Sequence, residues 1–174
     1  MVTQPYRYER PKDSCLITYQ RACVLQDYVE EIAPRQLRPE GKWKEIIQTA
    51  EGVERFARYS DYRMKFFDTL RLQVEKLVED IGVANSLNLF NSMQANERAK
   101  LQQECDNLLT RLEIAISRGV RYKHLKLKKY YLLYDKMKDV RSKLHSWRKS
   151  DIERIQKRID EYYKEHPDQE QLIL

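Results

Sequence analysis

Hydrophobic residues recur at steps of three and four along most of the chain, which is the period of an amphipathic α-helix. The first segment of this kind begins near Asp13 or Ser14, both of them good N-cap residues. It ends before Pro34, because the residue that precedes a proline disfavours helical geometry. Residues 34–41, with the sequence PRQLRPEG, are predicted to form a linker after this helix.

The longest periodic segment begins at Trp43 and is predicted to end at Gly82, with a candidate break near Ser60 and Asp61. Its period is set by Trp43, Ile46, Ala50, Val53, Ala57, Met64, Phe67, Leu70, Val74, Leu77 and Ile81. Residues 83–97 follow with a weaker pattern, which fits either a loop or a short helix.

Two further helices are predicted in the second half of the chain. The third ends at Gly119 and is marked by Leu101, Cys105, Leu108, Leu112 and Ala115. The fourth has a seven-residue rhythm, typical of a coiled-coil seam, formed by Tyr130, Leu133, Met137, Val140, Leu144 and Trp147. Near its end, Ser150 and Glu153 fit a capping box that would open a new helix, but an uninterrupted helix fits the pattern equally well.

This pattern predicts an all-α protein, an elongated antiparallel helical bundle with long, coiled-coil-like helices. We expect a flexible basic and aromatic arm at residues 1–12, a single helical-bundle domain at 13–165 and a C-terminal tail at 166–174. The low content of helix breakers supports the assignment, because 174 residues contain four glycines and five prolines.

Composition narrows the class of protein further. No apolar run approaches the length of about 20 residues that crosses a bilayer, and the N-terminus carries no apolar signal-peptide core. The cysteines Cys15, Cys23 and Cys105 are odd in number and lack C-x-x-C spacing, so we expect reduced thiols, mostly buried. Together these features predict a cytoplasmic protein that does not enter the membrane.

Motifs for catalysis or cofactor binding are absent from the sequence. The glycines stand singly, so a phosphate-cradling loop cannot form, and G-x-S-x-G does not occur. None of His124, His145 and His166 has a glutamate three residues before it, which excludes the helical di-iron pattern. We therefore expect no enzyme activity, no cofactor and no metal.

Charge is distributed very unevenly. Residues 118–149 hold twelve lysines and arginines and two acids, while the rest of the chain holds 21 basic and 25 acidic residues. The candidate nucleic-acid-binding residues in this segment are Arg118, Arg121, Tyr122, Lys123, Lys126, Lys128, Lys129, Lys136, Lys138, Arg141, Lys143, Arg148 and Lys149. Lysines and arginines neutralise phosphates, and an interleaved tyrosine can stack on an unpaired base.

A purely structural interpretation is also available for part of this charge. Basic residues beside a coiled-coil seam often pair with acids of a neighbouring helix, for which Glu75, Glu79, Glu104 and Glu113 are candidates. The remaining chain is too weakly acidic to neutralise the whole segment, so the excess favours a polyanionic partner.

The sequence thus predicts a non-enzymatic accessory subunit of a nucleoprotein assembly that binds the backbone of RNA or DNA without strong sequence preference. The alternative is a helical interaction or scaffold protein whose basic strip docks an acidic partner. A peripheral membrane protein is disfavoured, because the aromatic residues of the basic segment fit the packed seam. Other protein subunits are expected as partners, and the length of the seam suggests self-association.

Overall fold

The computed structural model describes residues 16–167, and within them every regular element is a helix. The prediction of an all-helical protein is confirmed. The helices are α1 (Ile17–Ile32), α2 (Lys42–Ile46), α3 (Ala50–Ser86), α4 (Ser92–Arg121) and α5 (Leu127–Glu165). The predicted arm at 1–12, Cys15 and the part of the predicted tail from residue 168 onward lie outside the described residues.

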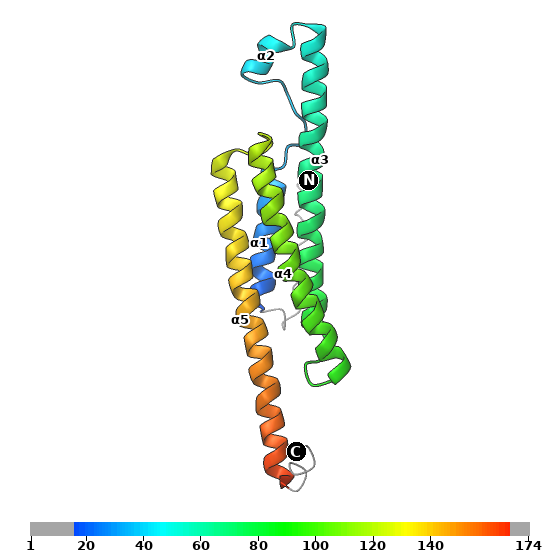
Figure 1. The fold of residues 1–174 in the computed structure, drawn as a ribbon, viewed down its shortest axis with the longest axis vertical. Helices are drawn as coiled ribbons and strands as arrows, with labels where there is room; N and C mark the ends of the chain where they lie inside the picture. Colours follow the sequence, from blue (N-terminus) through cyan, green and yellow to red (C-terminus); the bar gives the residue numbers. More distant parts are fainter. Residues whose placement is uncertain (1–15, 168–174) are drawn as a thin grey trace, which may run out of the picture.

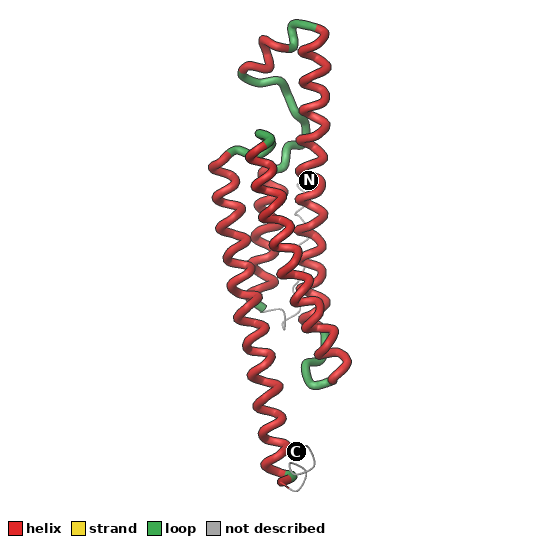
Figure 2. Tube along the Cα trace, viewed as in Figure 1, coloured by secondary structure: helices red, strands yellow, loops and turns green. Residues whose placement is uncertain are grey.

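Four of the helices lie side by side around one core. Helix α1 packs against α3 and α5, and α4 packs against the same two helices, so α1 and α4 occupy opposite corners. In Figure 1 the chain runs upward in α1 and α4 and downward in α3 and α5. The predicted elongated antiparallel bundle is compatible with this arrangement. Within residues 16–167 the loops lie at the two ends, as Figure 2 shows, so the described residues form helical faces along the bundle.

The core consists of the residues that repeat at helical spacing. In α5 the predicted seam is buried, since Leu133, Met137, Val140 and Leu144 are at most 1% exposed. In α4, Cys105 is fully buried, and this burial raises the pKa of its thiol to about 12. The expectation of buried cysteines therefore holds for Cys105, while Cys23 on α1 is half-buried.

The boundaries of α3 differ from the prediction in three places. The single helix predicted from Trp43 onward is divided into α2, which ends at Ile46, and α3, which begins at Ala50. The side chain of Thr49 caps α3 by accepting a 3.0 Å hydrogen bond from the Gly52 amide. There is no break near Ser60. The helix also continues through Gly82 to Ser86, in a region where α1 packs against it.

The later boundaries differ as well. Helix α4 begins at Ser92, where the Asn91 side chain caps it, and ends at Arg121 instead of at Gly119. Helix α5 is continuous through Ser150, so of the two alternatives the uninterrupted helix is the one that forms. The predicted end of the first helix before Pro34 is confirmed, since α1 ends at Ile32.

Two segments extend beyond the four-helix region, as Figure 1 shows. At the upper end, α3 projects past the other helices, and α2 folds back on it through contacts of the Trp43 ring with Phe56 and Tyr59. At the lower end, α5 projects past the loop between α3 and α4. The upper end also carries the turn between α4 and α5, where the most basic part of the sequence lies.

Candidate nucleic-acid interface

The turn between α4 and α5 is built by a helix-terminating motif. The amide of His124 donates to the Gly119 carbonyl at 2.8 Å, and the amide of Lys123 donates to the Val120 carbonyl at 3.0 Å. These are the two bonds of a Schellman motif, in which the residue at the Lys123 position adopts a left-handed conformation. Lys123 does so, with φ at 60°. The motif reverses the chain sharply, so the basic residues on both sides of the turn gather at one end of the bundle.

Helix α3 holds this turn in place. The hydroxyl of Tyr59 donates a 2.8 Å hydrogen bond to the Lys123 carbonyl, and Nε of Arg63 donates to the His124 carbonyl at 3.1 Å. The imidazole of His124 lies 5.5 Å from the Tyr59 ring and 5.8 Å from the Phe66 ring, measured between centroids. The turn is therefore fixed by side chains more than 50 residues away in the sequence.

The close approach of α3 and α4 beneath the turn depends on a glycine. A Cβ atom at Gly119 would lie 2.4 Å from the ring of Phe66. Because that distance is shorter than any ordinary contact, a larger residue would push α3 away from the turn.

Burial within this aromatic group lowers the pKa of His124, and the nearby positive charge of Arg63 lowers it further. His124 is therefore neutral at neutral pH and belongs to the support of the turn. At neutral pH it therefore carries no positive charge with which to bind an anion.

We call the six basic residues around the turn the basic corner: Arg118, Arg121, Lys123, Lys126, Lys128 and Lys129. All of them are exposed except Lys129, which is half-buried. None of the six forms an ion pair with a carboxylate of residues 16–167. Tyr122, which is 60% exposed, lies among them, and the guanidinium of Arg121 sits 6.0 Å from its ring centre.

The lysines of the basic corner sit where they disfavour folding. Lys126 is the N-cap residue of α5, makes no side-chain capping bond, and is followed by Lys128 and Lys129 in a first turn without acids. The N-terminus of a helix carries a positive partial charge, so acids stabilise this end and lysines destabilise it. By contrast, Arg118 and Arg121 lie in the last turn of α4, where the helix dipole favours positive charge.

A hollow of about 430 Å³ opens beside the basic corner, between the end of α4 and the start of α5. Its lining includes the basic residues Arg118 and Arg121 and the aromatic residues Tyr130 and Tyr134. The two tyrosine rings are stacked, with centroids 6.1 Å apart and planes 14° apart. This combination supplies an aromatic surface for a planar group and cations for a phosphate beside it.

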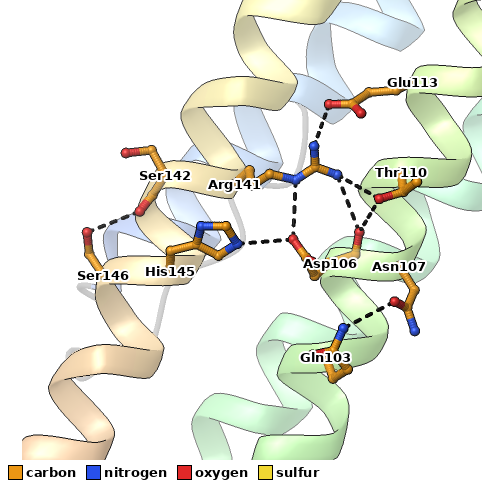
Figure 3. A network of polar contacts seen from close by, with 9 residues as sticks. All are labelled: Gln103, Asp106, Asn107, Thr110, Glu113, Arg141, Ser142, His145 and Ser146. Atoms are coloured by element: carbon orange, nitrogen blue, oxygen red, sulfur yellow. Dashed lines mark hydrogen bonds and ion pairs between the residues drawn. The ribbon is translucent and has the colours of Figure 1, made fainter.

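The carboxylate of the hollow is already neutralised. Glu113 lines the hollow, and Nη1 of Arg141 binds its Oε1 atom at 2.6 Å. The same guanidinium reaches Asp106 through Nε at 3.2 Å and the Thr110 hydroxyl at 3.0 Å, as Figure 3 shows. His145 also contacts Asp106 at 3.2 Å. Arg141 therefore links α5 to α4, in the way expected for a charge beside a helical seam.

Other residues of the predicted site lie farther along α5. The ammonium of Lys136 sits 5.2 Å from the ring centre of Tyr28 on α1, and that of Lys138 sits 5.6 Å from the ring centre of Tyr134. Lys149 pairs with Glu153 at 3.9 Å within the helix. Lys143 and Arg148 are half-buried. The structure thus gathers the first part of the predicted site at one end and spreads the second part along the bundle.

Sequence reasoning missed the contribution of Tyr130 and Tyr134 to this surface, because it assigned the aromatic residues of the basic segment to the packed seam. Both rings are partly buried against the core, and both also line the hollow. The signal that could have found them is their spacing of four residues at the start of a helix that follows a basic turn.

No known protein family, curated protein or solved structure matches this chain. Within residues 16–167, no helix has the length and apolarity that crossing a membrane requires.

Proposed function

We propose that this protein is a non-enzymatic nucleic-acid-binding subunit of a larger nucleoprotein assembly, and that it grips the phosphate backbone with the basic corner. The observation that carries the proposal is the gathering of six basic residues, unpaired with any carboxylate of residues 16–167, around one turn. Such a cluster raises the local concentration of polyanions and releases counterions when it binds them.

The hollow beside the basic corner favours an unpaired strand over a duplex. An exposed base can stack on the rings of Tyr130 and Tyr134 while Arg118 and Arg121 hold the adjacent phosphates. Bases within a duplex are already stacked, so they cannot use this surface. Because lysine and arginine contact the backbone, we expect little sequence preference.

The position of Lys126, Lys128 and Lys129 at the start of α5 supports a binding role for the charge. These residues weaken the helix terminus, as described above, so helix stability does not explain them. A bound phosphate would offset this destabilisation of the α5 N-terminus, because its negative charge compensates the lysines. We propose that the elongated bundle, with its coiled-coil-like seam, acts as a rigid scaffold with the basic corner at one end.

The test compares two variants of equal charge. The corner variant carries glutamine in place of Arg118, Arg121, Lys126 and Lys128. The control variant carries glutamine in place of the exposed lysines Lys44, Lys100, Lys157 and Lys164, all outside residues 118–149. Binding to labelled single-stranded RNA, single-stranded DNA and duplex DNA is measured by fluorescence anisotropy at moderate salt.

We expect the corner variant to bind single strands at least tenfold more weakly than the native protein, and the control variant to change much less. Equal losses in both variants would mean that net charge alone drives binding, and the basic corner would then have no special role. No binding by the native protein, together with binding to an acidic polypeptide that the corner variant loses, would replace this proposal by the acidic-partner alternative.

A further inference from the structure

The lower end of α5 is exposed and amphipathic. From Ile152 to Pro167 no side chain is buried, whereas the seam before it is tightly packed. Ile152, Ile159 and Tyr162 are 67%, 42% and 46% exposed. With the half-buried Ile155 they follow one another at steps of three, four and three, so they form one apolar stripe along the helix.

A groove of about 370 Å³ runs beside this stripe. Ile155, Ile159 and Tyr162 form one wall, and Leu89 and Phe90 from the loop between α3 and α4 form the other. The guanidinium of Arg158 lies 4.4 Å from the centre of the Phe90 ring and that of Arg154 lies 5.7 Å from it. The groove is thus lined mainly by apolar and aromatic side chains, and Arg158 adds a positive charge to its lining.

The charges that flank the stripe change sign along the helix. Arg154, Arg158, Glu161 and Glu165 follow one another at steps of four, three and four, so they lie on one flank. The two arginines are four residues apart, and so are the two glutamates. Like charges at this spacing repel each other and destabilise an isolated helix. Within one chain this repulsion is only partly offset, because Glu161 pairs with Lys157 at 3.9 Å and Arg158 lies three residues before Glu161. A second line of charges in the opposite order would compensate the like-charge pairs further.

A second copy of the same helix supplies that order. When two identical helices pair antiparallel about a two-fold axis, the same flank of each faces the other and the order of residues is reversed. Arg154 and Arg158 of one copy then lie beside Glu165 and Glu161 of the other. The apolar stripes meet at Ile159, and Phe90 of each copy lies close to Tyr162 of the other.

We infer that the protein forms an antiparallel homodimer through residues 152–165 of α5 and the adjoining groove. The helical part of this interface is about 21 Å long at 1.5 Å per residue. A contact of this length is small for a protein interface, so the dimer is in concentration-dependent exchange with the monomer. The two basic corners then lie at opposite ends of the dimer, where each can bind a separate strand segment.

The experiment is sedimentation velocity on the full chain, freed of nucleic acid, from low micromolar to several hundred micromolar. The basic flank is reversed in one variant, Arg154→Glu with Arg158→Glu, and the acidic flank in another, Glu161→Arg with Glu165→Arg. We expect the native protein to dimerise and each variant to dimerise at least tenfold more weakly, because like charges then face each other. An equimolar mixture of the two variants should form heterodimers at least as tightly as the native protein.

A matched control for the first variant carries Arg55→Glu with Arg58→Glu on the exposed part of α3, which changes net charge by the same amount as Arg154→Glu with Arg158→Glu. It should dimerise like the native protein. Three results would overturn the inference: a native protein that stays monomeric throughout, variants that dimerise normally, or two weakened variants that fail to associate when mixed. Circular dichroism of each variant confirms that the helices are intact. These outcomes are independent of nucleic-acid binding.

Discussion

The hydroxyl of Tyr59 on α3 donates a 2.8 Å hydrogen bond to the main-chain carbonyl of Lys123, in the turn between α4 and α5. The acceptor belongs to the residue with the left-handed backbone, which has φ of 60°. A conformation of this kind is unusual for lysine and persists when neighbouring contacts hold it. The projecting part of α3 thus fixes the geometry of the basic corner from outside it.

Replacing Tyr59 by phenylalanine is expected to loosen the turn while keeping the ring. The free energy of unfolding should fall by about 1 kcal/mol, the usual net contribution of such a hydrogen bond. The amides of Lys123, His124 and Leu125 should exchange with solvent faster in hydrogen-exchange measurements. Tyr62→Phe on the same helix is the control, since its side chain is 62% exposed. Equal protection of the turn in both variants would show that the Tyr59 hydroxyl does not hold it.

Lys126 offers a test of the conflict between binding and stability. Serine is a good N-cap residue, so Lys126→Ser should raise the free energy of unfolding by about 0.5–1 kcal/mol. It should also weaken binding to single-stranded nucleic acid, because one phosphate contact is lost. Lys126→Gln removes the charge without supplying a cap, and it should weaken binding with a smaller gain in stability. Denaturant unfolding and anisotropy titrations measure the two effects, and a serine variant that is less stable would contradict the account.

The lower part of the bundle contains a buried ion pair that should be sensitive to the loss of either partner. Two nitrogens of Arg98 on α4 bind the two carboxylate oxygens of Asp151 on α5 at 2.6 and 2.8 Å, and Gln102 donates to the same carboxylate. The guanidinium also lies 4.9 Å from the ring centre of Trp147. Both charged side chains are less than a tenth exposed.

Asp151→Ala is expected to cost about 3–5 kcal/mol, because it leaves the Arg98 charge buried without its partner. The double variant Arg98→Met with Asp151→Leu should be more stable than Asp151→Ala, because it removes both charges at once. Urea unfolding of the single and double variants measures the difference. If the double variant were the least stable of the set, the ion pair would stabilise the fold by more than the free-energy cost of removing its two charges from water.

The lowered pKa of His124 predicts a dependence of stability on pH. The unfolded chain has the ordinary histidine pKa of about 6.5, so below this pH it binds a proton that the folded protein resists. The contribution of His124 to the free energy of unfolding is therefore complete above about pH 6.5 and declines as the pH falls below that value. His124→Phe keeps an aromatic ring among Tyr59 and Phe66 but cannot be protonated, so its unfolding free energy should decline less over this range. Parallel curves for the two proteins would exclude His124 as the cause.

The helical periodicity was sufficient to predict the helices and most of the core. The seam from Leu133 to Trp147 is buried as predicted, because an apolar residue at every third or fourth position leaves one face to pack. The next position of the same seam is Asp151, and the sequence alone did not reveal it as a core residue. A buried aspartate can be recognised as a core residue only from its ion-pair partner, and the partner of Asp151 is Arg98, which lies 53 residues away in the sequence.

Local signals also explain the errors at the helix ends. The sequence predicts a helix end at Gly82, but the residue lies inside α3, where a Cβ atom would make an ordinary contact with the Tyr19 ring of α1 at 3.4 Å. The turn after α4 contains no residue typical of a stop at its left-handed position, since Lys123 occupies it. Tertiary contacts from Tyr59 and Arg63 decide that geometry, and they cannot be predicted from local sequence. The excess of charge was visible in the sequence, but its division between the basic corner and the α4–α5 contact of Arg141 required the fold.

The most direct test of the central claim is the salt dependence of binding to a single-stranded oligonucleotide, compared between the native protein and the corner variant lacking Arg118, Arg121, Lys126 and Lys128. For single strands, the logarithm of the binding constant falls with the logarithm of salt concentration by about 0.7 for each phosphate neutralised. If the four side chains contact phosphates, their removal should lower this slope by about three. An unchanged slope in the corner variant, whatever its affinity, would contradict a phosphate-binding role for the basic corner.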